Sequence, residues 1–247
     1  MTTVILFVFG AIIGSFLNVV GLRWNSGRTL GGRSHCASCG RTLGPHDLVP
    51  IVSYLLLRGR CSGCKSKISS QYLLVELWTG LIFVTLYFVA GLTPYFLLLT
   101  TVFCIYIVIT IYDLHHKIIP DQLVYLAIIL SFLTTYYPLP TTNLFDWLAG
   151  PLLFLFFASI WFLSHGRAMG FGDAKLALSI GLLLGAALGF SAVIIAFWIG
   201  AAWGLSCMIF SHKKITMKSE IPFAPFLVLG AWVSLVLELD LLHVSLF

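Results

Sequence analysis

Long apolar stretches alternate with short polar connections along nearly the whole chain. At about 1.5 Å of helix rise per residue, each stretch can cross or nearly cross a hydrocarbon core of about 30 Å. The shortest two, Gln122–Tyr137 and Leu176–Gly189, must stand nearly upright, thin the bilayer, or be wrongly counted as spans. The pattern predicts eight transmembrane helices, in the stretches Val4–Leu22, Tyr72–Ala90, Tyr95–Tyr112, Gln122–Tyr137, Leu144–Leu163, Leu176–Gly189, Ser191–Phe210 and Phe223–Leu242.

The composition supports this interpretation. Hydrophobic residues make up 60% of the 247 residues and charged residues 9%, with a mean hydropathy of +1.03, whereas about 25% of the residues of an ordinary soluble domain are charged. We therefore expect an all-α polytopic membrane protein. One insert resembles a soluble protein in composition, so the predicted parts are a first transmembrane helix (1–22), the insert (23–70) and a helical membrane domain (71–247).

All fourteen Lys and Arg residues lie on one side when the apolar stretches are threaded through a bilayer in order. The connections on the other side carry none, and the positive-inside bias therefore places the basic side in the cytoplasm. Topology and contact with anionic headgroups account for the net charge of +5, so no nucleic acid partner is expected. The first apolar stretch lacks a basic start and a cleavage site, which predicts a retained helix. The basic connections are Arg23–Ser70, Asp113–Asp121, Ser164–Lys175 and Ser211–Ile221.

The insert contains two C-x-x-C pairs, Cys36 with Cys39 and Cys61 with Cys64. Each pair offers two thiolates from a tight turn, and this spacing predicts one tetrahedral structural zinc site. Disulfides or thiols without metal are the alternatives, although a cytoplasmic loop is in a reducing compartment. His35 is a possible substitute ligand. A closed four-thiolate site has no open coordination position, so the zinc would fold the insert without doing chemistry.

Two acids stand at matching membrane depths. Asp113 ends the third apolar stretch, and Asp173 precedes the sixth, within Gly170-Phe171-Gly172-Asp173. The glycines on either side of Phe171 allow close approach of an extended substrate. If the two carboxylates face each other they share a proton, as in an aspartyl hydrolase. We interpret Asp121 as a helix N-cap and Asp146 as an interfacial or capping acid on the outer side; Glu76 could pair with an arginine of the insert.

Other reaction classes lack their motifs. The sequence has no G-x-S-x-G elbow, no Walker loop and no H-E-x-x-H. His115 and His116 are adjacent on a helix and therefore point about 100° apart, so they do not chelate one metal naturally.

Taken together, these motifs resemble the type IV prepilin leader peptidase/N-methyltransferase family over nearly the whole chain. One departure is Ala224, where the family's last motif is expected to have glycine. The matching segments are Gly14-Ser15-Phe16-Leu17-Asn18-Val19, the two cysteine pairs, Pro50–Cys61, Lys67-Ile68-Ser69, Tyr72, Val75-Glu76, Asp113 with Ile119-Pro120-Asp121, Gly170–Leu176 and Ile221-Pro222-Phe223-Ala224-Pro225-Phe226.

The resemblance implies a peptidase of the bacterial inner membrane with Asp113 and Asp173 as the catalytic pair. It implies that prepilins or pseudopilins of type IV pilus or type II secretion systems are cut on the cytoplasmic side, after the glycine that ends a short basic leader. It also implies N-methylation of the new N-terminus by S-adenosylmethionine, and Glu76 is a candidate residue of the methyl-donor site. The alternatives are a transporter whose aspartates bind cations and a non-enzymatic assembly factor that docks through the insert.

Overall fold

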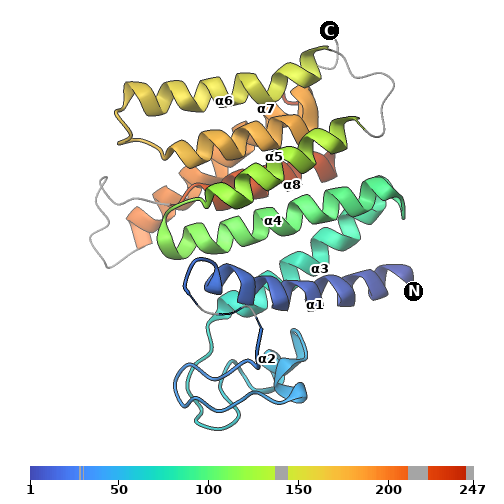
Figure 1. The fold of residues 1–247 in the computed structure, drawn as a ribbon, viewed down its shortest axis with the longest axis vertical. Helices are drawn as coiled ribbons and strands as arrows, with labels where there is room; N and C mark the ends of the chain where they lie inside the picture. The colour runs from blue at the N-terminus through green and yellow to red at the C-terminus, as the bar shows by residue number, and fades with distance from the viewer. Residues whose placement is uncertain (28, 30, 137–143, 211–221, 243–247) are drawn as a thin grey trace. The chain divides into compact units, whose positions relative to one another are not determined.

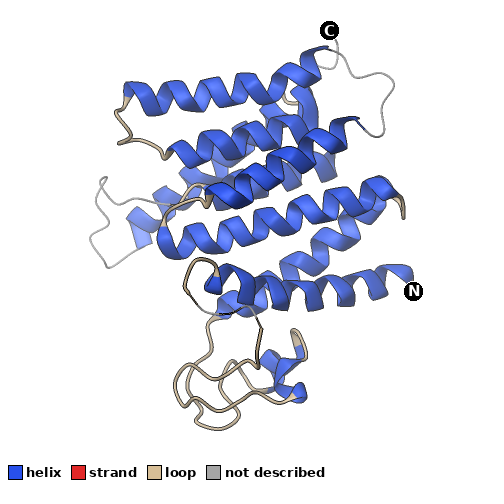
Figure 2. Ribbon diagram, in the orientation of Figure 1, coloured by secondary structure: helices blue, strands red, loops and turns tan. Residues whose placement is uncertain are grey.

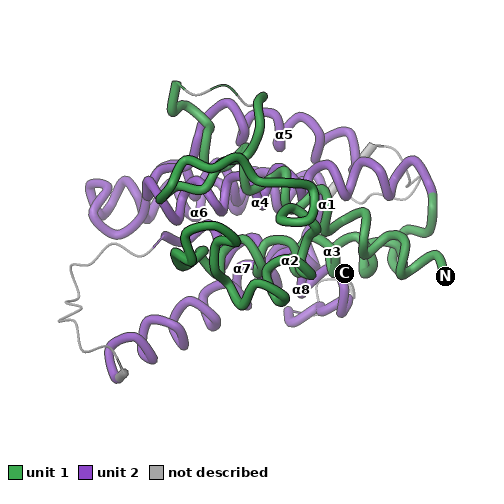
Figure 3. The backbone as a smooth tube through the Cα atoms, turned by 90° about the horizontal axis from the view of Figure 1, so that it is seen from below, with its two compact units in different colours: residues 1–92 green, residues 93–247 purple. Residues whose placement is uncertain are grey.

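The structure is a computed structural model that describes residues 1–27, 29, 31–136, 144–210 and 222–242. Within these ranges the chain is mainly helical and contains no strand beyond two isolated β-bridges, as Figure 2 shows. The chain divides into two compact units, unit 1 (Met1–Leu92) and unit 2 (Thr93–Phe247), which Figure 3 colours separately.

Unit 1 consists of two long helices with the insert between them. Helix α1 (Thr2–Arg23) packs along α3 (Ser70–Ala90), and the Ser69 side chain begins α3 by accepting a hydrogen bond from the Gln71 amide. Between these helices lie the short 3-10 helix η1 (Pro45–Leu48) and α2 (Val52–Leu56), which contact each other. The two long helices thus provide the base on which the insert folds (Figure 1).

Unit 2 is built around α7 (Phe171–Phe210), which packs against α5 (Asp121–Tyr136), α6 (Leu144–Leu163) and α8 (Ala224–Leu237). Helix α4 (Pro94–His116) contacts α5 and α8. The predicted all-helical membrane fold is confirmed. Among the described residues, five helices are long and apolar enough to cross a membrane (α1, α3, α4, α6 and α7), and α5 and α8 are shorter apolar helices.

Three buried hydroxyl groups join the helices at the centre of unit 2. The Ser179 hydroxyl of α7 lies 2.8 Å from the Tyr106 hydroxyl of α4 and 2.9 Å from the Ser131 hydroxyl of α5. All three side chains are fully buried. A hydroxyl buried in an apolar interior without a hydrogen-bond partner costs free energy. These two hydrogen bonds therefore fix α4, α5 and α7 relative to one another.

The sixth and seventh predicted stretches both lie in α7, where two helices follow each other across a break, but the turn between them had been predicted near Gly189. The helical conformation breaks at Gly185, with φ 73° and ψ −171°. A Cβ on Gly189 would come 3.3 Å from the Gly181 Cα, so the chain folds back between these two glycines. The Asp146 carboxylate accepts a hydrogen bond from the Ala186 amide at 3.0 Å, which confirms the capping interpretation of Asp146.

The last predicted stretch extends beyond the end of its helix. Helix α8 ends at Leu237, before the predicted Leu242, because Glu238 adopts the left-handed conformation with φ 49°. The predicted outer connection Pro138–Asn143 and the basic connection Ser211–Ile221 lie outside the described residues.

We expect Gly185→Ala to destabilise the protein more than Gly91→Ala does. Both glycines occupy a region of φ and ψ that is essentially restricted to glycine, since Gly91 has φ 62° and ψ −167°. A Cβ on Gly91 meets open space, whereas a Cβ on Gly185 would come 2.7 Å from the Asp146 Oδ1. The free energy of unfolding, measured by denaturant titration in detergent micelles, should therefore fall by about 1–3 kcal/mol more for Gly185→Ala. Equal losses would show that the Asp146 contact does not constrain the turn.

Candidate functional site

Asp113 lies in the last turn of α4. The helix ends because Lys117 adopts the left-handed conformation and donates its amide hydrogen to the Asp113 carbonyl at 2.7 Å. The Asp113 side chain is 5% exposed, and its Oδ2 accepts a hydrogen bond at 3.3 Å from the amide of Ala224, the first residue of α8. The motif around Ala224 thus provides a backbone donor to this acid, a role that the sequence did not reveal.

Asp173 is the third residue of α7 and is 8% exposed. Its amide donates to the Gly170 carbonyl at 3.2 Å, and its carboxylate accepts a hydrogen bond from the Gly170 amide. This is the geometry of an acid at the third helical position reaching back to the residue before the helix. Asp113 and Asp173 interact electrostatically. The structure therefore brings together the two acids that the sequence singled out, each beside the N-terminus of a helix.

The segment Gly170–Gly172 positions Asp173 through tight packing. A Cβ on Gly172 would lie 2.8 Å from the Ile119 Cβ, so glycine permits the start of α7 to contact the connection that follows Asp113. Neither Gly170 nor Gly172 is among the glycines with positive φ. The Phe171 ring contacts the rings of Phe154 and Trp161 on α6. A role of this segment in substrate approach stays a prediction.

Asp121 has an ion-pair partner, and Glu76 has partners that differ from the arginine considered for it. Asp121 lies in the first turn of α5, and its Oδ1 forms an ion pair with Lys175 Nζ at 2.7 Å. Glu76 is 7% exposed on α3, and its Oε2 accepts the amide hydrogen of Ile51 at 2.7 Å. Among the described residues, the partners of Glu76 are therefore the Ile51 amide and the Ser15 side chain, and no arginine pairs with it.

The four insert cysteines lie on two turns with the same hydrogen-bond pattern. Cys36 donates its amide hydrogen to the Arg41 carbonyl and its carbonyl accepts from Gly40; Cys61 does the same with Ser66 and Lys65. Gly40 and Lys65 share the left-handed conformation, and an isolated β-bridge closes each turn. The residues that flank the two C-x-x-C pairs differ in composition, so this structural repeat is not evident from the sequence.

The sulfur atoms of these two turns converge. The four Sγ atoms lie within 4.8 Å of one another, and Cys36 Sγ is 3.7 Å from Cys64 Sγ. A tetrahedral site with Zn–S bonds of about 2.3 Å requires sulfurs about 3.8 Å apart. Backbone amides of Cys39 and Ser38 donate to the Cys36 sulfur and lower the pKa of its thiol to about 6, which favours the thiolate form that binds metal. In the described part of the chain, no histidine or acid joins this cluster.

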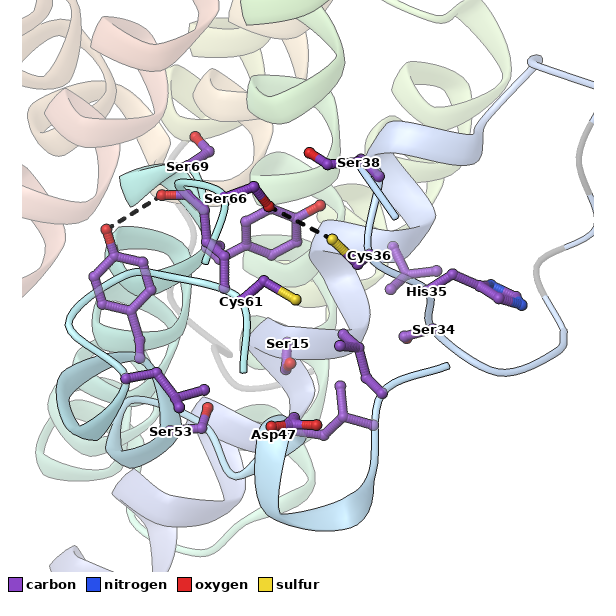
Figure 4. A pocket seen from close by; sticks show the side chains of 18 of the residues that line it. Ser15, Ser34, His35, Cys36, Ser38, Asp47, Ser53, Cys61, Ser66 and Ser69 are labelled. Carbon is purple, nitrogen blue, oxygen red and sulfur yellow. Dashed lines mark hydrogen bonds between the residues drawn. The ribbon is translucent and has the colours of Figure 1, made fainter. Parts of the chain in front are cut away.

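A cavity of about 700 Å³ lies in unit 1. Its walls come from the ends of α1 and α3 and from the insert. Figure 4 shows Cys36 and Cys61 at one part of the cavity and Ser15, Asp47 and Ser53 at another. The Asp47 side chain accepts a hydrogen bond from the Gly44 amide, which lowers the pKa of its carboxyl group and keeps it ionised.

These features define a helical membrane protein with a paired-aspartate site and a separate four-cysteine insert. Residues 8–90 match the family described as bacterial peptidase A24 N-terminal domain, and residues 98–205 match the type IV leader peptidase family. A relative from Bacillus subtilis (strain 168), named prepilin leader peptidase/N-methyltransferase, is 32% identical over 92% of this chain and 91% of its own length.

Two further relatives of the same name are similar over comparable lengths. The one from Pseudomonas aeruginosa is 29% identical over 92% of this chain and 88% of its own length, and the one from Neisseria gonorrhoeae is 30% identical over 92% and 87%. No solved structure matches the chain. The chain belongs to the type IV leader peptidase family, as the sequence motifs indicated. Family membership favours neither a transporter nor a non-enzymatic assembly factor.

Proposed function

We propose that the chain cleaves the leader peptides of type IV prepilins or pseudopilins, with Asp113 and Asp173 as the catalytic pair. The observation that carries this proposal is the burial and mutual interaction of the two carboxylates at adjoining helix ends in unit 2. Two buried carboxylates that interact do not ionise together readily, and the proposed mechanism therefore has the pair hold one shared proton.

The proposed reaction uses the shared proton. The ionised carboxylate takes a proton from water while the water oxygen attacks the scissile carbonyl carbon, and the protonated carboxyl donates its proton to the carbonyl oxygen. As the tetrahedral intermediate collapses and the C–N bond breaks, the carboxyl that took the water proton gives it to the leaving amine, and the other carboxylate takes back a proton from a hydroxyl of the intermediate, which restores the singly protonated pair. The Ala224 and Gly170 amides, which donate to Asp113 and Asp173, hold the two carboxylates in place for both steps.

The proposed location is the bacterial cytoplasmic membrane, with the acids and the insert facing the cytoplasm. The support is the restriction of Lys and Arg to one set of connections. A site at this boundary reaches a peptide bond just outside an inserted pilin helix. Co-expression with a panel of prepilins tests this function: leader loss from at least one of them is expected, with the new N-terminus following the leader's last glycine.

For the insert we propose a structural zinc ion held by Cys36, Cys39, Cys61 and Cys64. The convergence of their sulfurs on a tetrahedral spacing supports this site. The ion would bind the two turns together, and it takes no part in the proposed cleavage. The assignment of 23–70 as a folding module between the parts 1–22 and 71–247 belongs to the same proposal.

We also propose that the chain N-methylates the mature pilin with S-adenosylmethionine, because the relatives are named N-methyltransferases. The electron pair of the neutral amine forms an N–C bond as the methyl–sulfur bond breaks, S-adenosylhomocysteine leaves, and the amine loses a proton. Glu76, buried beside the cavity of unit 1, is the candidate donor-site residue.

Labelled S-adenosylmethionine tests the methylation directly. We expect label on the N-terminal residue of the mature pilin, in an amount that approaches one methyl group per cleaved chain. The Asp113→Asn variant is the control: without cleavage it has no new N-terminus to methylate, so label should be absent. Complete cleavage with an unlabelled, free N-terminus would show a peptidase without transferase activity.

A further inference from the structure

The segment that contains η1 and α2 carries an apolar surface that the rest of the insert does not cover. Its aliphatic side chains are exposed by 41% at Leu48 and by as much as 78% at Leu56. Apolar side chains that lie together at the surface of a polar module mark a surface that an apolar partner covers. The residues of this surface, which we call the aliphatic patch, are Leu48, Val49, Val52, Leu55 and Leu56.

The aliphatic patch and the cavity of unit 1 occupy opposite sides of α2. At about 100° of rotation per residue, Val52, Leu55 and Leu56 share one side of this helix. Ser53, labelled in Figure 4, and Tyr54 lie on the other side and line the cavity. The helix is therefore amphipathic, with its polar side packed against unit 1 and its apolar side turned outward.

The contacts of α2 place it beside the first turns of α3. Ile51, the residue before α2, donates its amide hydrogen to the Glu76 Oε2 at 2.7 Å, and Glu76 also accepts a hydrogen bond from the Ser15 side chain of α1. At about 1.5 Å of rise per residue, Glu76 lies about 9 Å along α3 from its start at Ser70. Helix α2 thus begins below the ends of α1 and α3, at the level where headgroups meet acyl chains.

The backbone at Ile51 fixes the direction in which the patch points. Ile51 has φ 64° and ψ −55°, a conformation that is strained for a β-branched residue. The hydrogen bond from its amide to the buried Glu76 carboxylate compensates for this strain. Because α2 follows Ile51 directly, the orientation of the patch is set by a membrane helix and not by the insert alone.

The surroundings of the patch are basic. Arg58 and Arg60 follow α2 closely and are both exposed. Asp47 is the only acid in the sequence of the insert; it lines the cavity, and its carboxylate accepts the amide hydrogen of Gly44. An apolar side flanked by exposed basic residues is the pattern of segments that lie in the plane of an anionic membrane surface.

We propose that η1 and α2 form an interfacial anchor, which buries the aliphatic patch at the boundary between headgroups and acyl chains. Arg58 and Arg60 then contact anionic phospholipid headgroups, and the partner that covers the patch is lipid. Interfacial helices bury their apolar side about 5–10 Å into this boundary, in agreement with the depth of Glu76. The anchor attaches the insert to the bilayer at a place besides α1 and α3, and it depends on neither the proposed cleavage nor the proposed methylation.

Photochemical labelling of the full-length chain in lipid nanodiscs tests the anchor. A diazirine-bearing amino acid is incorporated in place of Leu56, and phospholipid adducts are identified by mass spectrometry after irradiation. Thr42 is the matched control, because it is exposed in the insert but lies outside the patch, and Ile12, exposed on α1, is the positive control. We expect lipid adducts at positions 12 and 56, and on the order of 10-fold fewer at position 42.

Nanodiscs with equal amounts of phosphatidylcholine and phosphatidylglycerol test the basic residues. The proportion of phosphatidylglycerol among the adducts should be several-fold higher at position 56 than at position 12, because basic side chains near the surface attract anionic headgroups. The Arg58→Gln, Arg60→Gln double variant should lose this enrichment. Its lipid adducts at position 56 should persist, since the aliphatic patch is unchanged.

Equal lipid labelling at positions 42 and 56 would overturn the anchor, and so would labelling at position 12 alone. Cross-links from position 56 to a second copy of the chain or to a prepilin, without lipid adducts, would assign the patch to a protein partner instead. Enrichment of phosphatidylglycerol that survives the double variant would refute the role of Arg58 and Arg60 in binding headgroups.

Discussion

Asp113→Asn and Asp173→Asn are each expected to abolish leader cleavage while leaving the protein inserted in the membrane. An amide can neither accept the proton of the attacking water nor share a proton with the opposite carboxyl. Removal of one member of a catalytic unit typically lowers activity by several orders of magnitude, on the order of 10⁴-fold or more. The effect is measured as the fraction of a co-expressed prepilin that loses its leader.

Asp121→Asn is the matched control for this prediction. It makes the same chemical change at the first residue of α5, but Asp121 is 61% exposed and its partner Lys175 is 14% exposed. Ion pairs with one well-solvated partner contribute little, about 0–1 kcal/mol when exposed, and Asp121 takes no part in the proposed chemistry, so cleavage by this variant should stay close to that of the wild type. Near wild-type cleavage by Asp173→Asn would refute the two-aspartate mechanism.

The helical fold was predictable because hydrophobic length decides it. A stretch such as Leu144–Leu163 has one stable solution in a bilayer, and the structure reproduces it as α6. The fold-back inside α7 was misplaced because Gly181, Gly185 and Gly189 recur every four residues in an otherwise apolar segment. The contact with Asp146, which is distant in sequence, identifies Gly185 as the turn, and no local pattern carries that information.

The candidate site shows the same division between local and distant information. Acids are rare near apolar stretches, so Asp113 and Asp173 could be singled out from their own surroundings. The donor to Asp113 is the backbone of Ala224, more than one hundred residues away, and a backbone amide leaves no signature in the sequence. Gly172 also meets a packing requirement at Ile119 that only the folded helices create, and its role in substrate approach stays a prediction.

The expected arginine partner of Glu76 was wrong for a related reason. An acid one turn inside a membrane helix suggests an arginine partner, because opposite charges are the obvious means of compensation. The structure uses the Ile51 amide in a strained turn. Backbone N–H groups of irregular loops can donate hydrogen bonds to a buried carboxylate in place of a charged side chain. The amino-acid composition does not show which of the two will do so.

Loss of metal from the insert is the second large effect that we expect. Purified protein should contain about one zinc ion per chain, and a Cys61→Ser, Cys64→Ser double variant should contain almost none. Two of the four thiolates are then missing, and the binding free energy of a structural zinc is also the folding free energy of its site. Metal analysis and hydrogen exchange of residues 31–70 measure the loss of the ion and the loosening of the insert.

The Cys104→Ser, Cys207→Ser double variant is the control, since these thiols lie on α4 and α7 and are outside the cluster. It should keep its zinc and its slow exchange in the insert. Leader cleavage by the Cys61→Ser, Cys64→Ser variant should persist, because both proposed catalytic acids belong to unit 2. Metal-free wild-type protein whose four insert thiols all react with an alkylating agent under native conditions would contradict the zinc site, and the two turns would then be held only by their own hydrogen bonds.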